Sequence, residues 1–215
     1  MAEELVVQLA FFLMTLAMFF AVLKYPKQAL TKFRTKNRNR TTVQSSHHLA
    51  QASNLLERTR SIHRKAQSLA HAKNALAEAE KVVSLSPRDP AAHIIKALAL
   101  DLMDRQTSAL RSLDLALSPP CAKSLSRGER GDALVKRAEL KLAMNRKRRV
   151  DSAVDDLIEA VRLCDGDAGS RALCLLGQCY EWKGLMESTR ENCEKALSME
   201  PGSFVARQGL GRSGS

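Results

Sequence analysis

An Ala-x3-Leu-x2-Ala pattern occurs twice in this chain, and this recurrence restricts the possible folds more than any other feature. The copies begin at Ala109 and Ala153, and a related pattern begins at Ala75. Each copy places its apolar residues on one face of an α-helix. Repeated helix pairs of this kind are typical of solenoids, because stacking buries apolar faces that one pair alone would expose. A second apolar segment with a small residue accompanies most copies, and these small residues are Ala97, Ala138 and Gly177.

The amino-acid composition favours helices over sheets. Hydrophobic residues make up 45% of the chain, so a sizeable core can form, whereas aromatic residues make up only 4%. The abundance of Ala and Leu suits close-packed helices, and a β-sandwich would need more β-branched and aromatic side chains. The cysteines include no Cys-x2-Cys pair, so we expect buried, reduced thiols in a cytosolic environment rather than zinc ligands.

A long apolar segment near the N-terminus, residues 5–23, contains no charged side chain. As a helix it would extend over ~28 Å, close to the ~30 Å of a bilayer core. A cleavable signal peptide would have a basic start and a shorter apolar run, whereas Glu3 and Glu4 precede this one. We therefore expect an uncleaved single-pass anchor, Leu5 to Leu23, after a short N-terminal segment, residues 1–4. The positive-inside rule then puts the C-terminal domain in the cytosol, at an endoplasmic reticulum, mitochondrial or plastid outer membrane.

Two basic runs contribute to the formal net charge of +11. The first lies in a juxtamembrane linker, residues 24–48, and could bind acidic lipid headgroups. The second lies in a predicted turn between two helices and could contact lipid or RNA phosphate. No aromatic residue is interleaved with it, so bases have no stacking platform and nucleic acid is not the expected partner. The basic residues are Lys24, Lys27, Lys32, Arg34, Lys36, Arg38 and Arg40 in the first run and Arg146, Lys147, Arg148 and Arg149 in the second.

The last helix pair carries the most specific motif of the chain. Its key residues are Leu173, Leu176, Gly177 and Tyr180 in the first helix and Ala196 and Pro201 in and after the second. This segment resembles a tetratricopeptide repeat (TPR), in which a small residue lets two helices approach closely and a proline ends the second helix. The resemblance extends over residues 49–210, before a tail at residues 211–215. It implies an all-α fold, an α-solenoid of antiparallel helix pairs. The apolar segment at residues 5–23 adds one transmembrane helix before this solenoid.

The earlier helix pairs depart from the family pattern. Lys96-Ala97 and Arg137-Ala138 stand in place of Leu-Gly, and Lys141 stands where tyrosine is usual. Alanine still provides a small surface at these positions. A loop at residues 121–131 and the basic turn after Asn145 lengthen the spacing between the copies. We therefore expect the same helix pairs with weaker conservation of the repeat motif.

The resemblance also implies a binding surface. In TPR proteins the first helix of each pair lines a concave groove, where an extended peptide or a partner helix can bind. A chaperone C-terminal tail is disfavoured, because Ile94, Ile95 and Leu98 take groove positions where a clamp needs polar side chains. Trp182 is equally compatible with contacting a partner and with packing under the turn near Lys183. The groove residues expected from the pattern are Arg60, Ile94, Leu98, Asp101, Lys136, Glu139, Gln178 and Trp182.

No catalytic constellation accompanies the repeats. The histidines form no His-Glu-x2-His motif, and no phosphate-binding Gly-x4-Gly-Lys-Ser/Thr loop is present. We therefore expect no enzyme activity, cofactor or metal. The favoured function is that of a membrane-anchored TPR-like adaptor or receptor whose helical-repeat domain binds a protein or peptide. The alternative is a membrane-tethered basic helical-repeat protein that binds RNA or anionic lipid.

Overall fold

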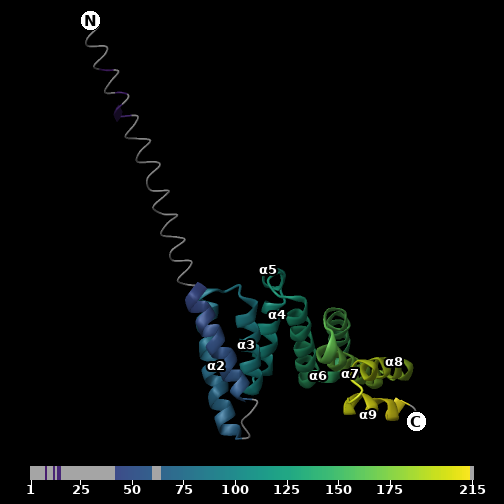
Figure 1. The fold of residues 1–215 in the computed structure, drawn as a ribbon. Helices are drawn as coiled ribbons and strands as arrows, with labels where there is room; N and C mark the ends of the chain where they lie inside the picture. The colour runs from purple at the N-terminus through teal and green to yellow at the C-terminus, as the bar shows by residue number, and fades with distance from the viewer. Residues whose placement is uncertain (1–7, 9–11, 13, 16–41, 60–63, 214–215) are drawn as a thin grey trace. The chain divides into compact units, whose positions relative to one another are not determined.

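The structure, a computed structural model, describes residues 8, 12, 14–15, 42–59 and 64–213, and every regular element among them is a helix (Figure 1). The helices comprise residues 42–59, α2 (Lys65–Leu85), α3 (Pro90–Leu102), α4 (Gln106–Ala116), α5 (Pro119–Ala122), α6 (Arg127–Leu163), α7 (Gly166–Trp182), α8 (Met186–Met199) and α9 (Phe204–Ser213). Residues 47–215 form one compact unit. The expected linker extended to residue 48, whereas residues 42–48 are already helical and His48 bonds to Glu78 on α2.

Within this compact unit the helices pack mainly against their neighbours in sequence, from α2 to α9. The core accordingly consists of successive clusters. One joins Leu56 to α2 and α3, and a second joins Leu113 of α4 to α3 and α6. A third joins Leu157 of α6 to α7, and a fourth joins Leu173 of α7 to α8 and α9. This arrangement confirms the predicted all-α solenoid of helix pairs.

The repeat pattern places the same structural positions next to one another in successive pairs. Glu80, Asp114 and Ile158 each follow the central residue of the pattern on the second helix of a pair. The first helix of the next pair meets each of them with a matching side chain. Lys96 bonds to Glu80 at 3.0 Å, and Arg137 bonds to Asp114 at 3.3 Å. Leu176 and Ile158 instead belong to one apolar cluster. The interfaces between pairs are therefore of two chemical kinds, charged and apolar.

The turns inside two of the pairs are almost identical. Asp104 follows α3 with a φ of 58°, and Gly184 follows α7 with a φ of 75°. In each turn the next residue donates its N–H five residues back, from Arg105 to the Leu100 carbonyl and from Leu185 to the Tyr180 carbonyl. This is a helix C-terminus closed by a left-handed residue, a conformation that favours glycine. Asp104 occupies a position that suits glycine better.

Substitutions at the left-handed positions of these two turns should change the stability of the fold in opposite directions. We expect Asp104→Gly to stabilise the fold by about 0.5 kcal/mol and Gly184→Ala to destabilise it by about 1 kcal/mol, since a Cβ is disfavoured at positive φ. Gly202→Ala is the matched control, because an added Cβ meets no atom there and the residue has no positive φ. Urea denaturation followed by circular dichroism measures all three variants. A stabilised Gly184→Ala variant would contradict the interpretation.

Helix α6 includes two stretches that the sequence analysis expected to be non-helical, the end of the loop at residues 121–131 and the basic turn after Asn145. The predicted loop at residues 121–131 contains the end of α5 and the start of α6. Helix α6 starts here because Ser126 and Glu129 form a reciprocal capping box at its N-terminus. The predicted basic turn is also helical. Asn145, with φ −161° and ψ 90°, is the only break, and its side chain accepts a hydrogen bond from the Arg148 N–H at 3.1 Å. Asn145 thus caps a second helical segment that begins directly with the basic run.

The predicted membrane localisation is corrected by the structure. Within the described part of the chain, no helix is both long enough and apolar enough to cross a membrane. Most of the expected span at residues 5–23 lies outside the described residues, as does the whole first basic run, Lys24 to Arg40. The prediction of a single-pass protein with a cytosolic C-terminal domain is therefore withdrawn.

Candidate protein-binding groove

A groove of ≈ 530 Å³ lies along the first helices of three successive pairs. The first half of α6 forms its centre, between residues of α3 and the first two turns of α7. Its apolar floor consists of Ala91, Ile94, Ile95, Leu98, Leu125, Ala133, Val135 and Ala168. Ile94, Leu98, Leu125 and Ala168 are only half-buried, so part of the floor remains accessible. The groove is within the volume range of ligand pockets and has an apolar surface for a partner side chain.

A chain of ion pairs crosses the groove and connects the three helices. Lys136 of α6 bonds to Asp101 of α3 at 2.7 Å and to Glu139 of its own helix at 3.2 Å. Glu139 in turn accepts hydrogen bonds from the guanidinium of Arg171 on α7. The side chains of Lys136, Asp101 and Glu139 are each about a quarter exposed. These contacts connect the first helices of the three pairs along the groove.

The two cations of the groove are neutralised by this network. Burial acts to lower the pKa of Lys136, but hydrogen bonds and charges from Asp101 and Glu139 outweigh it and raise the pKa. Lys136 therefore stays protonated at neutral pH, held by two carboxylates. Arg171 is held by Glu139. Neither cation is left to attract an acidic ligand strongly.

The structure brings together most of the groove residues expected from the sequence. Ile94, Leu98 and Lys136 line the groove, and Asp101 and Glu139 border it through the ion pairs. Gln178 and Trp182 lie farther along α7 and do not line it. Arg60 is outside the described residues. A role for these side chains in partner binding stays a prediction.

Sequence reasoning missed three acidic residues and one basic residue of the groove: Glu129, Asp132, Asp167 and Arg171. A signal for part of this set was present in the sequence. Glu129, Asp132, Lys136 and Glu139 follow the spacing of one helix face. The expected loop at residues 121–131 concealed this face, because it removed the first turn of α6 from the helix.

The second basic run has an aromatic partner that its sequence neighbourhood does not reveal. The guanidinium carbon of Arg146 lies 4.0 Å from the ring centroid of Trp182, a cation–π geometry. Trp182 is 40% exposed. Arg146 is therefore already engaged, while Lys147 and Arg148 are exposed and Arg149 is half-buried. Binding of a phosphate-bearing ligand by this run stays a prediction.

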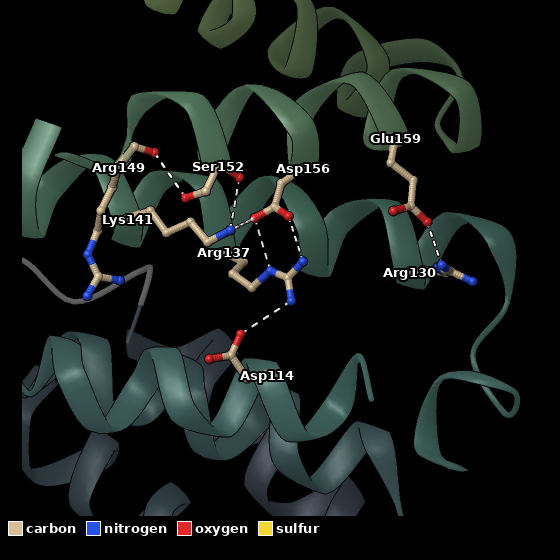
Figure 2. A network of polar contacts seen from close by, with 8 residues as sticks. All are labelled: Asp114, Arg130, Arg137, Lys141, Arg149, Ser152, Asp156 and Glu159. Atoms are coloured by element: carbon tan, nitrogen blue, oxygen red, sulfur yellow. Dashed lines mark hydrogen bonds and ion pairs between the residues drawn. The ribbon is translucent and has the colours of Figure 1, made fainter. Parts of the chain in front are cut away.

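A buried carboxylate joins the two halves of α6 outside the groove. Figure 2 shows Asp156 of the second half between Arg137 and Lys141 of the first half. Arg137 donates to both carboxylate oxygens, at 3.0 and 2.6 Å, and Lys141 donates at 2.7 Å. Lys141 also donates to the Ser152 carbonyl, and Arg137 reaches Asp114 on α4. Arg137 and Lys141, the departures from the TPR pattern, thus form a polar junction where the family places Leu and Tyr.

Comparison with known proteins gives structural similarity alone. No protein-family model matches the chain, and no curated protein matches its sequence. The crystal structure of the MamA protein is similar over 79% of this chain and 80% of its own, at 18% identity and a TM-score of 0.60.

Two further solved structures are similar. The pilF protein of Pseudomonas aeruginosa matches over 80% of this chain and 68% of its own, at 15% identity and a TM-score of 0.61. YrrB, a TPR protein with an unusual peptide-binding site, matches over 68% of this chain and 69% of its own, at 19% identity and a TM-score of 0.55. The chain accordingly has the TPR-like all-α solenoid fold that its last helix pair predicts.

Proposed function

We propose that this protein is a non-catalytic adaptor whose helical-repeat unit binds a segment of another protein in the groove between α3, α6 and α7. The observation that carries the proposal is the half-exposed apolar floor shared by three successive first helices. An accessible apolar surface inside a concave, rigid frame is the usual arrangement for burying a partner side chain. The structural similarity to YrrB, a TPR protein with a peptide-binding site, is consistent with it.

The frame of the groove is suited to binding a partner rather than to chemistry. The ion pairs of Lys136 with Asp101 and Glu139, and of Glu139 with Arg171, hold the three helices together before any ligand arrives. A preformed groove loses little conformational entropy on binding, which leaves more of the contact energy for affinity. The groove side chains themselves show no nucleophile adjacent to a base.

Filling the groove should abolish partner binding. In Ala168→Trp an indole replaces a half-buried methyl group at the first turns of α7 and occupies the space above the floor. We expect affinity for groove-selected peptides to fall at least tenfold, about 1.4 kcal/mol. Phage display of random peptides on the immobilised full chain supplies the ligands, and fluorescence anisotropy measures the affinity.

The matched control is Ala143→Trp, which adds the same indole at an exposed position of α6 that does not line the groove. It should leave binding unchanged. Selected peptides that bind Ala168→Trp as well as the original chain would show that partner binding does not use this groove.

A further inference from the structure

The groove is bordered by three carboxylates that have no cationic partner among the described residues. We call Glu129, Asp132 and Asp167 the carboxylate rim. All three line the groove and are exposed. The side chains of Asp132 and Asp167 make no hydrogen bond or ion pair within the described part of the chain, and the Glu129 side chain bonds only to Ser126. The rim therefore has unused capacity for charge-assisted hydrogen bonds.

Ser126 stabilises the charged form of Glu129, one of the rim carboxylates. The backbone N–H of Ser126, and then its hydroxyl, bond to Glu129 and lower the pKa of that carboxyl. The three rim carboxylates border an apolar floor whose cations, Lys136 and Arg171, are already paired.

This local charge is opposite to that of the whole chain. The formal net charge is +11, so a cationic ligand gains nothing from long-range attraction to the protein as a whole. Within roughly 8 Å, the screening distance at physiological salt, a bound segment meets the rim carboxylates, whereas the cations Lys136 and Arg171 are paired with other carboxylates. Complementary charges at such short range set specificity more than overall attraction does.

We propose that the groove selects a partner segment that places an aliphatic or aromatic side chain on the apolar floor and Lys or Arg side chains against the carboxylate rim. This inference rests on the proposed function and adds the chemistry of the partner. Arginine suits the rim best, because its planar guanidinium can bond two carboxylate oxygens at once. An acidic segment is disfavoured because it would face three uncompensated carboxylates.

Three matched peptide libraries test the proposal on the full chain. Each displays a fixed Leu or Phe, flanked by Lys and Arg in the first library, by Ser and Asn in the second and by Asp and Glu in the third. We expect enrichment from the basic library and none from the acidic one. The affinity of the best basic peptide should fall when the salt concentration rises, because screening weakens contacts with the rim.

Two variants identify the rim as the source of this preference. Asp132→Asn with Asp167→Asn removes two charges with little change of shape, and we expect the Kd of the best basic peptide to rise about tenfold. Asp155→Asn is the control, an exposed carboxylate of α6 that forms no ion pair and does not line the groove. Its Kd should stay unchanged, as should binding of neutral peptides to the double variant.

The outcomes separate the two proposals. Binding that Ala168→Trp abolishes but that favours neutral or acidic flanks would overturn the basic preference and leave the groove function standing. A basic preference that survives the double variant would also overturn it. If no library yields binding that Ala168→Trp reduces, the groove function itself fails and the inference fails with it.

Discussion

Replacing Asp156 with alanine should cost about 3–5 kcal/mol of stability, because removing one partner of a buried ion pair leaves charges without compensation. The Asp156 side chain is 6% exposed and is the shared acceptor for Arg137 and Lys141, which are 20% and 13% exposed. Both cations would then lie half-buried without their main counter-charge. Urea denaturation of the full chain, followed by circular dichroism, measures the loss.

Two companion variants separate charge from shape. Asp156→Asn keeps the size and one acceptor, so we expect a smaller loss than for alanine. A triple variant, Arg137→Met, Lys141→Met and Asp156→Leu, replaces the whole junction with apolar side chains and should recover most of the stability. A loss below about 1 kcal/mol in Asp156→Ala would show that the junction behaves like an ordinary surface ion pair.

Placing a methyl group on Gly131 should destabilise the fold by about 1–3 kcal/mol through overpacking. Gly131 is buried on α6, and an added Cβ would lie 2.1 Å from the Sγ of Cys164, just beyond the end of the same helix. The substitution Cys164→Ala removes that sulfur. In this background Gly131→Ala should cost little or stabilise the fold, because alanine is a better helix former than glycine by about 1 kcal/mol.

A double-mutant cycle with the four proteins measures the coupling between these positions. We expect a coupling free energy of about 1–3 kcal/mol, since the two residues are in direct contact. Additive effects of the single substitutions would mean that the thiol moves aside freely.

The cysteines are buried and free of disulfides in the structure, as their pattern predicts. Burial raises the pKa of the Cys179 thiol to about 11.

The repeat architecture could be predicted because its signal is periodic and redundant. Ala109, Leu113 and Ala116 are completely buried. Their counterparts Ala153, Leu157 and Ala160 are completely buried as well. Each copy supports the same interpretation, so weak motifs in one pair are compensated by the next. The buried face of each helix could therefore be predicted from its own sequence, without knowing which helices pack against it.

The errors arose where a single side chain decides the local structure. Asn145 ends one helical segment and caps the next, which a basic sequence around it does not reveal. Ser126 and Glu129 carry a recognisable capping-box spacing, which the expected loop at residues 121–131 left unused. The pairing of Arg171 with Glu139 depends on helices distant in sequence. The unpaired state of the carboxylate rim could not be predicted for the same reason.

The interfaces between helix pairs differ in chemistry, and this difference determines which pair can come last. Lys96 bonds to Glu80 and Arg137 bonds to Asp114, whereas Leu176 and Ile158 belong to one apolar cluster. If the last pair were exchanged with an earlier one, Leu176 would lie next to a carboxylate and a cationic side chain would lie next to Ile158. Repeated units whose interfaces are identical can pair with the wrong neighbour during folding. The two charged interfaces are alike, so the apolar interface at Ile158 is the one that specifies the last pair of the stack.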